Sequence, residues 1–464
     1  MPYENQLGSK TSHSDVVRNP EVQAFLKRCE PFKEPSEDEL KSLTDLFASP
    51  DYTENPPAVR HVIASDGSFY HSSIDDRFPS VQVSYLKFST ILIEMADFDG
   101  LEDSETHLVD PFRVATLQRN RDTLTLVLPL SNFRLPTDKS VRETFRRQTE
   151  EFLRSPATRF RETDDSTSLL RTLAELALLR EDPNAPTNHI RVHRCPDDEC
   201  ESRDIYLDLG QTKWQCAGCG GELFISDCLR IWEGITDLHA KQEPASRFMS
   251  YLEHLLPVHY ARYLSRESPT GLAGLALMID GPLAVFGNAA WLHSSIMRFY
   301  SRLRTQCRAN NQLGPIVVGL QKTGYVVDFM NRLAPHIQGD KLFSITDEFR
   351  YEHLGVQRSG NGFGSETYYG HDFAFKTSSG KMFIFALPYP FEAKSASPDF
   401  ATLKSERDRY PELTRAVALI NEVSTDLYRD AVIPIALAHR HAAISLKPGG
   451  RVLDIMGRET RGAR

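Results

Sequence analysis

Residues 272–287 read LAGLALMIDGPLAVFG, an apolar run that breaks at Asp280 and Gly281. A second apolar run, residues 315–329 (PIVVGLQKTGYVVDF), breaks at a lysine and a glycine in a similar way. Each run has the composition of a buried strand that ends in a turn. Residues 289–308, which lie between them, are expected to form a helix. This order predicts two parallel neighbouring strands joined by a right-handed crossover.

Segments on both sides of this unit have the periodicity of strands or helices. Strands rich in β-branched and aromatic residues are expected within residues 58–70, where the apolar run ends in a turn at Asp66-Gly67-Ser68, and at 81–98, 122–130 and 381–390. Helices are expected at residues 141–154, 168–181 and 246–264, and again within 412–444. The sequence therefore predicts an α/β fold in which a mixed sheet is flanked by helices.

The N-terminal segment has helix-start signals of its own. Asn19-Pro20 starts one expected helix, and Ser36 with Glu39 forms a capping box before another. The pair Pro56-Pro57 then interrupts the chain. Residues 1–57 are therefore expected to form a helical extension.

The composition is that of a folded, acidic chain. Its 464 residues allow two or three domains, and 54 Lys and Arg against 63 Asp and Glu give a net charge of −9. A negative surface argues against a general nucleic-acid coat protein, although a local basic groove is compatible with it. No apolar run reaches the roughly 18 residues of a membrane span, and the polar N-terminus does not resemble a signal peptide. A cytoplasmic protein without a membrane segment is expected.

Four of the seven cysteines form two tight pairs. Four residues separate Cys195 from Cys200, two separate Cys216 from Cys219, and fifteen lie between the pairs. This spacing is typical of a zinc ribbon, in which four thiolates bind Zn²⁺. Because four cysteines fill the coordination shell, the zinc is predicted to be structural; the alternative is four unrelated thiols in a reducing compartment. Contact of the ribbon with DNA and contact with a partner protein both stay open.

Two aspartates stand where an apolar strand meets a glycine: Asp66 in ASDGS and Asp280 in LMIDGPL. A single Asp-Gly of this kind is usually only a turn. Two of them can converge at one edge of the sheet, where carboxylate oxygens suit Mg²⁺ or Mn²⁺. With a third carboxylate from a helix, such a pair would form a two-metal phosphodiesterase site.

Four short motifs, in a fixed order along the chain, carry a resemblance to a known family. They are ASDGSFY at 64–70, MIDGPLAVFG at 278–287, IVVGLQKTG at 316–324 and PIALAHRHAAIS at 434–445. The chain thus resembles the NurA family over about residues 58–450, with the zinc ribbon as an insertion. The resemblance implies a ribonuclease H-like fold and a manganese-dependent DNA exonuclease and endonuclease. It also implies a homodimer and a partner, the hexameric HerA-type ATPase and translocase.

The resemblance divides the chain into five parts. They are a helical extension (1–57), the first part of the nuclease domain (58–189), the zinc-ribbon insert (190–230), the second part of the nuclease domain (231–450) and a C-terminal tail (451–464).

The resemblance also implies metal ligands. Asp66 and Asp280 match the family aspartates that bind Mn²⁺ or Mg²⁺. The family glutamate, on the helix before the second aspartate, has two matches. Glu175 in LLRTLAELALL fits the motif, with Arg171 four residues before it. Glu253 in YLEHLL lies on the helix immediately before the Asp280 strand. Both stay candidates, and an ordinary helix-surface carboxylate is the alternative for each.

Two cationic residues complete the implied site. Lys322 ends a strand at a place where a cation can meet a scissile phosphate, although many such lysines are merely solvated. His439 matches a family histidine on the closing helix, with His441 as the fallback and a buried helix histidine as the alternative. The family tyrosine eight positions earlier is replaced by Ala431, so its role is absent or moved.

A separate segment, YYGHDFAFKT, combines aromatic and cationic side chains. Tyr369, His371 and Lys376 have the chemistry to stack on bases and contact phosphates of a single strand. A plain β-hairpin edge explains the same residues.

The sequence thus predicts a Mn²⁺- or Mg²⁺-dependent deoxyribonuclease that acts at DNA ends. Its coupling to a HerA-type translocase would serve end resection or antiviral defence. The first alternative is a catalytically inactive nucleic-acid-binding adaptor, suggested by Ala431 and by the ambiguous glutamate. The second is a nucleotidyl or phosphoryl transferase. The absence of a G-x-x-x-x-G-K loop argues against an intrinsic ATPase.

Overall fold

The computed structural model describes residues 12–29, 35–50, 58–75, 77–98, 101, 121–358, 360–394, 399–424, 432–444 and 449–462. The chain forms two compact units, Met1–Phe47 and Ala48–Arg464. The described part of the first unit contains the helices α1 (Ser12–Arg18), α2 (Pro20–Arg28) and α3 (Glu37–Thr44). Asn19 caps α2, and Ser36 with Glu39 forms the capping box of α3. Both helix starts that the sequence predicted are confirmed.

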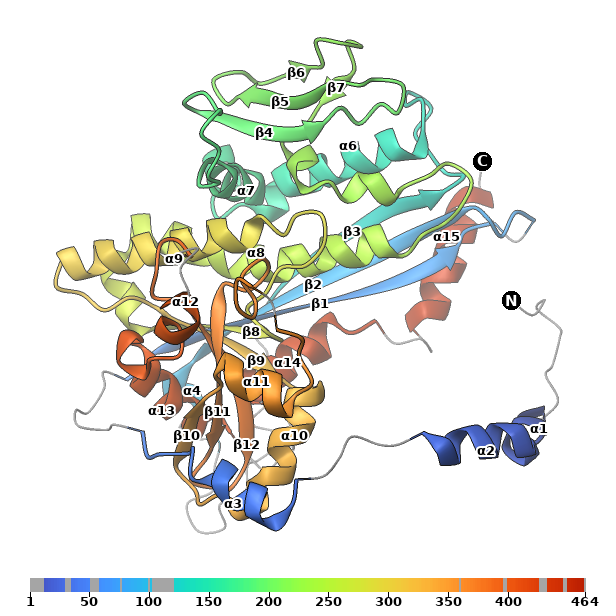
Figure 1. The fold of residues 1–464 in the computed structure, drawn as a ribbon. Helices are drawn as coiled ribbons and strands as arrows, with labels where there is room; N and C mark the ends of the chain where they lie inside the picture. The colour runs from blue at the N-terminus through green and yellow to red at the C-terminus, as the bar shows by residue number, and fades with distance from the viewer. Residues whose placement is uncertain are drawn as a thin grey trace. The chain divides into compact units, whose positions relative to one another are not determined.

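The second unit is built on an eight-stranded sheet with the order β10-β11-β12-β9-β8-β1-β2-β3 (Figure 1). Its strands are β1 (His61–Ser73), β2 (Gln82–Glu94), β3 (Arg121–Ser131), β8 (Leu275–Asp280), β9 (Ile316–Gln321), β10 (Lys341–Ser344), β11 (Gly370–Lys376) and β12 (Met382–Pro388). β8 runs parallel to both β1 and β9, and all other pairs of this sheet are antiparallel. Three antiparallel strands followed by two strands parallel to the first are the arrangement of a ribonuclease H-like sheet. The predicted mixed α/β fold is confirmed.

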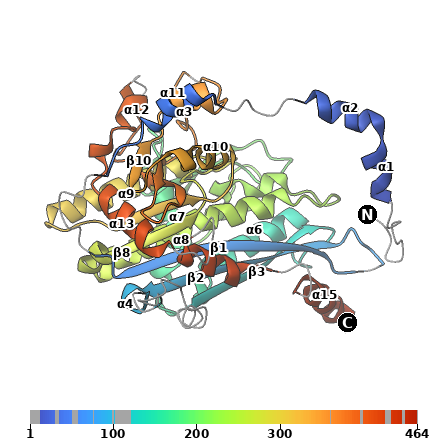
Figure 2. The ribbon, with the colours of Figure 1, turned by 90° about the horizontal axis from the view of Figure 1, so that it is seen from below.

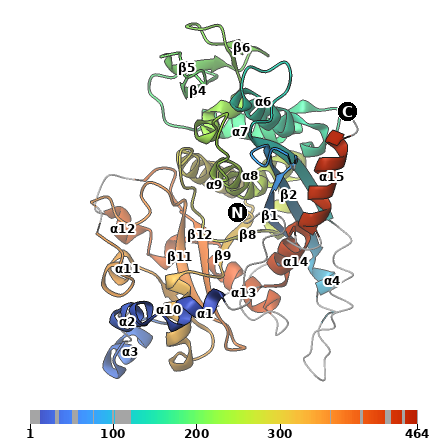
Figure 3. The same cartoon turned by 90° about the vertical axis from the view of Figure 1, so that its right-hand side faces the viewer.

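Helices cover both faces of the sheet (Figures 1 and 3). On one face lie α6 (Val141–Arg154), α7 (Leu169–Leu178), α8 (Glu243–Glu267) and α9 (Leu292–Ala309); on the other lie α13 (Leu413–Val423) and α14 (Ile433–Ala442). The side chains of β1 alternate between these layers, because Ile63 packs with α8 whereas Val62 and Ala64 pack with α14. Smaller helices are α4 (Met95–Phe98), α10 (Tyr325–Leu333), α11 (Asp347–His353) and α12 (Asp399–Leu403).

The two Asp-Gly positions have different backbones. At Asp280 the expected break occurs: β8 ends, Gly281 has a φ of +107°, and its N–H donates to the Leu320 carbonyl over 2.8 Å. Glycine adopts this positive φ without a steric penalty. The turn expected after Asp66 is wrong, because β1 continues through Gly67 and pairs with β2 along its whole length.

The cysteine-rich segment forms two small hairpins. β4 (His189–Arg194) pairs with β5 (Arg203–Asp208), and β6 (Trp214–Gln215) pairs with β7 (Glu222–Leu223). Ile190, Val192 and Leu207 belong to the same hydrophobic core as α6 and α7, so the insert is packed onto these helices (Figure 1).

The segment expected as a C-terminal tail contains a helix, α15 (Arg451–Gly462) (Figure 2). Oδ2 of Asp454 accepts a hydrogen bond from the Tyr70 hydroxyl over 3.0 Å, and its Oδ1 accepts one from the Ser72 hydroxyl over 2.6 Å. These bonds attach α15 to the distal half of β1. Within the described ranges, none of the helices has both the length and the apolar character needed to cross a membrane.

Candidate active site

Two aspartates stand at matching positions on the neighbouring parallel strands β1 and β8. The register of the strands makes Asp66 and Asp280 the residues that follow the last shared pair. Both face the α14 side, because Ala64 and Met278, two positions earlier, belong to the core on that side. β8 ends here while β1 continues, so the two carboxylates lie at a step in the sheet.

The helix α14 brings a histidine to this step. Nδ1 of His439 donates a hydrogen bond to Oδ2 of Asp66 over 2.6 Å. Ligand atoms of Asp66, Asp280 and His439 all lie within 4.8 Å of one another. Carboxylate oxygens with an imidazole nitrogen suit a divalent ion such as Mn²⁺ or Mg²⁺, so the donor set fits the predicted metal.

The electrostatics of Asp66 agree with a cation site. The residue is only 5% exposed. Burial, followed by the negative charge of Asp280, raises the pKa of Asp66 above its ordinary value, although the bonds from His439 and Gly67 act in the opposite direction. Two carboxylates that repel each other in a poorly hydrated place are stabilised by a cation between them.

Glu253 reaches the same point from the opposite face of the sheet. It lies on α8, and its Oε1 accepts a hydrogen bond from the Gly67 N–H over 3.1 Å; the same N–H lies 2.9 Å from Oδ1 of Asp66. Burial, followed by the charges of Asp66 and Asp280, raises the pKa of Glu253 to about 8. Of the two candidate glutamates, Glu253 is the one that shares an electrostatic environment with both aspartates.

Gly67 makes this approach possible. A Cβ at this position would lie 3.0 Å from Oε1 of Glu253 and 2.8 Å from Cγ of Met249. The glycine therefore allows α8 side chains to come close to the β1 backbone, and it does not form a turn. Sequence reasoning missed this role, although a glycine inside a strand is a recognised signal of such an approach.

Replacing Gly67 with alanine should separate Glu253 from the β1 backbone. We expect activity to fall about tenfold or more, because small displacements of catalytic groups are costly. The comparison is the cleavage rate of Gly67→Ala against Gly360→Ala, whose added Cβ meets nothing within 4 Å. Equal rates for the two variants would remove the proposed role of Gly67.

Glu175 has a different environment, on α7. Its two oxygens accept hydrogen bonds from Nε and Nη2 of Arg262, each over 2.7 Å, and Arg266 adds a contact of 2.8 Å. Although burial raises the pKa of Glu175, these arginines hold it below its ordinary value. Glu175 thus belongs to a structural ion-pair cluster and lies outside the group of ligand atoms at Asp66.

Lys322 also comes to the step in the sheet. It follows β9 directly, and its Nζ lies 2.6 Å from Oδ2 of Asp280. The structure therefore brings together five of the predicted residues: Asp66, Glu253, Asp280, Lys322 and His439. Ala431 lies outside the described residues.

The model of the NurA domain matches residues 60–273. The chain contains a NurA domain. The matched residues include Asp66 and Glu253, whereas Asp280, Lys322 and His439 follow them in the chain.

Two solved structures are similar to this NurA-family chain. One is the crystal structure of the NurA nuclease from Sulfolobus solfataricus, with 8% identity, a TM-score of 0.37 and 98% of each chain covered. The other is a crystal structure of NurA, with 9% identity, a TM-score of 0.30 and 98% of each chain covered. No curated protein matches the chain. The family assignment rests on the matched domain.

Three residues predicted to bind DNA lie on or beside β11 and are engaged within the protein. Tyr369 is 0% exposed and its hydroxyl lies 2.8 Å from Nδ1 of His254, while His371 is 3% exposed. Nζ of Lys376 donates to two backbone carbonyls over 2.6 Å each. Burial prevents base stacking by Tyr369 and His371 in this conformation, so the expected DNA contacts of this segment are not supported. The aromatic pattern reflects core packing.

The four cysteines of the NurA-family insert form one cluster, with all sulfurs within 4.8 Å of one another. Sγ of Cys195 lies 3.6 Å from that of Cys219, and Sγ of Cys200 lies 3.7 Å from that of Cys216. A tetrahedral Zn²⁺ with Zn–S bonds of about 2.3 Å requires sulfurs about 3.8 Å apart. The cluster therefore fits zinc. Both of these sulfur–sulfur contacts join a cysteine of the first turn to a cysteine of the second.

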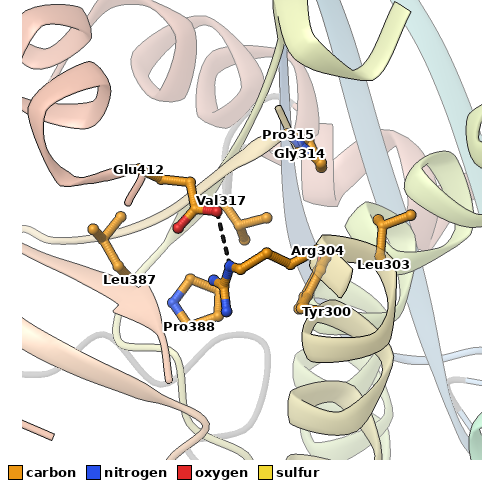
Figure 4. Close-up of a pocket in the computed structure, with 9 residues that line it drawn as sticks. All are labelled: Tyr300, Leu303, Arg304, Gly314, Pro315, Val317, Leu387, Pro388 and Glu412. Atoms are coloured by element: carbon orange, nitrogen blue, oxygen red, sulfur yellow. Dashed lines mark hydrogen bonds and ion pairs between the residues drawn. The ribbon is translucent and has the colours of Figure 1, made fainter. Parts of the chain in front are cut away.

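A small cavity lies at the other end of β9 (Figure 4). It is bordered by Tyr300 and Arg304 of α9, and Nε of Arg304 donates to Oε1 of Glu412 over 2.8 Å. Its volume of about 20 Å³ has room for about one water molecule. A nucleotide cannot enter it, so this cavity is not a second substrate site of the NurA-family protein.

Proposed function

We propose that this NurA-family chain is a metal-dependent deoxyribonuclease. The observation that carries the proposal is the convergence of Asp66, Asp280 and His439 within 4.8 Å. Glu253 approaches them from the α8 side, where its carboxylate bonds to the Gly67 N–H. Lys322 pairs with Asp280. Metal-assisted phosphodiester hydrolysis uses carboxylates to bind the metal, together with side chains such as lysine and histidine that stabilise charge or transfer protons.

Each residue has a part in the proposed reaction. Asp66 and Asp280 would hold the divalent ion, which supplies positive charge at the phosphate and lowers the pKa of an attacking water. Glu253 would add negative charge from the α8 side of the sheet, and its hydrogen bond with the Gly67 N–H fixes its position. The His439 side chain is 63% exposed and keeps Nδ1 on Asp66, so its Nε2 is the nitrogen available to move a proton at the substrate.

The test of the function is cleavage of labelled linear DNA by the purified full-length chain. Degradation is expected with Mn²⁺ or Mg²⁺ and none with excess chelator. Ca²⁺ is expected to support binding without cleavage, because its loose coordination positions water poorly. Binding of DNA without cleavage under every metal condition would favour the inactive adaptor.

The finer proposals rest on the family resemblance. We propose action at DNA ends, a cytoplasmic homodimer, and a HerA-type hexameric ATPase as partner, in end resection or antiviral defence. The net charge of −9 supports the need for a partner, since it provides little long-range attraction to DNA.

A partner that feeds DNA to the site should therefore raise the nuclease rate. The isolated chain is expected to bind duplex DNA weakly and to lose that binding steeply with salt. Adding a HerA-type ATPase with ATP should accelerate degradation, measured on the same linear substrate. Full activity alone, unchanged by the ATPase, would contradict the partnership.

The cysteine cluster is proposed to bind one structural zinc per chain. Changing Cys216 and Cys219 to serine should release that zinc and destabilise the insert, since binding and folding are coupled in such ribbons. Metal analysis and thermal melting measure both effects. Wild-type protein that contains no zinc, when purified without chelator, would contradict the proposal.

A further inference from the structure

The apolar segment that follows Asp280 carries an exposed aromatic ring. Phe286 is 52% exposed, and within the described part of the second unit only one phenylalanine, Phe78 at 58%, is more exposed. Leu283 and Val285, on the same segment, are both 0% exposed. The segment thus buries its other large apolar side chains and leaves this ring in contact with solvent.

Phe286 is the most exposed of three aromatic rings that contact one another in succession. Its ring meets that of Tyr368 edge to face, with the centroids 6.0 Å apart, and the ring of Tyr368 lies 4.8 Å from that of Phe363. Tyr368 and Phe363 are half-buried. The guanidinium of Arg350 lies over the Phe363 ring, 4.1 Å from its centroid. Two segments far apart in the sequence therefore build one partly exposed aromatic surface.

Hydrogen bonds hold the backbone beneath this surface. The Val285 N–H donates to the Thr367 carbonyl over 2.9 Å, which ties the two segments together. The Phe286 carbonyl accepts a hydrogen bond from the Tyr251 hydroxyl of α8 over 3.1 Å. Contact with a ligand costs little conformational entropy when an aromatic side chain with two rotatable bonds stands on a fixed backbone. The exposed ring is thus prepared for binding.

The aromatic surface lies close to the proposed metal site. Phe286 follows Asp280 by six positions, which limits the distance between their Cα atoms to about 22 Å. A strand of DNA advances about 3.4 Å per phosphate, so a strand held at Asp280 would meet the ring within about six nucleotides. A cation is also near, since a Cβ at Gly287 would lie 3.3 Å from Nε of Arg247, which pairs with Glu243 on α8.

We propose that Phe286, supported by Tyr368, stacks on an unpaired base of the strand that the metal site cleaves. The inference rests on the deoxyribonuclease function proposed above and adds a contact to a base. Every base has a π face, so such stacking tolerates any sequence. The base must be unpaired and unstacked, because neighbouring base pairs cover its faces in a duplex. The stacking expected of Tyr369, which is buried, would thus fall to the adjacent Tyr368 and to Phe286.

Binding of strands with and without bases tests the inference. Full-length, zinc-containing protein in Ca²⁺ is titrated into fluorescent oligothymidylate and into an abasic strand of the same length, with anisotropy as the signal. The wild type should bind oligothymidylate more tightly than the abasic strand. Phe286→Ala should weaken binding of oligothymidylate roughly 5- to 150-fold and leave binding of the abasic strand unchanged. Phe286→Trp should keep the wild-type affinities, whereas Phe286→Leu, which is apolar without a π face, should resemble Phe286→Ala.

The matched control is Phe78→Ala, which removes a ring of similar exposure from the connection between β1 and β2 and should change neither affinity. A wild type without preference for the strand that contains bases would overturn the inference, and so would an equal loss in Phe78→Ala. Wild-type affinity in Phe286→Leu would also overturn it, since the contact would then be apolar and suited to a partner protein. A wild type that prefers oligothymidylate but cleaves no DNA with Mn²⁺ would overturn the nuclease function alone. Thermal melts verify folding, and the Leu and Trp variants decide the matter if Phe286→Ala does not fold.

Discussion

Asp66→Asn and Asp280→Asn are each expected to abolish DNA cleavage, by roughly a thousandfold or more. Asparagine keeps the size of aspartate and part of its hydrogen bonding but removes the charge that would bind the metal. The ligand atoms of the two residues lie within 4.8 Å of each other and of His439, so they should act as one unit. The double variant should therefore be no worse than either single variant, because effects of residues in one site are strongly non-additive.

Folding should not suffer from these changes. Burial and the charge of Asp280 already disfavour the ionised form of Asp66, as its raised pKa shows. Neutralising either partner relieves that repulsion in the metal-free protein, so melting temperatures should stay equal or rise slightly. The measurements are Mn²⁺-dependent degradation of a linear duplex and thermal melts of all three variants. Robust cleavage by Asp280→Asn would show that its Asp-Gly is only a turn, and the assignment of the metal site to Asp66 and Asp280 would be wrong.

The convergence of these aspartates could be predicted from local patterns. Hydrophobic runs that end at Asp66 and Asp280 identify two buried strands, and parallel strands bring equivalent residues side by side. The same logic placed Lys322 one strand away, and the register of β8 with β9 agrees with it. Local patterns gave the strand ends and the residue types, whereas the parallel pairing of β1 with β8, which sets the two aspartates side by side, is seen only in the structure.

The third carboxylate could not be chosen from the sequence. Periodicity predicts that Glu175 and Glu253 both lie on amphipathic helices, but it does not tell which helix crosses the sheet at Asp66. That choice depends on a contact between Glu253 and Gly67, which are 186 residues apart. Likewise, the segment around Tyr369 has the composition of a binding surface. Only its packing against α8 shows that Tyr369 is buried.

The two glutamates should therefore respond in opposite ways to the same change. Glu175→Gln removes the charge of the carboxylate that pairs with both Nε and Nη2 of Arg262, a residue that is 3% exposed. Leaving that guanidinium partly unpaired should cost about 1 to 3 kcal/mol of unfolding free energy. The folded fraction should keep its cleavage rate, because the carboxylate of Glu175 is paired with Arg262 and Arg266, whereas Glu253 shares the Gly67 N–H with Asp66.

Glu253→Gln should instead preserve stability and remove activity, by about a hundredfold or more. The amide retains an oxygen to accept the Gly67 N–H, so the side chain keeps its contact with β1. What is lost is the negative charge next to Asp66 and Asp280, which the metal would need and which the metal-free fold tolerates poorly. Mn²⁺ affinity, cleavage rate and melting temperature, measured in parallel for both variants, separate the two roles. If Glu175→Gln lost activity and Mn²⁺ affinity while Glu253→Gln kept both, the third carboxylate would be Glu175. The close approach of Glu253 to Gly67 would then serve packing alone.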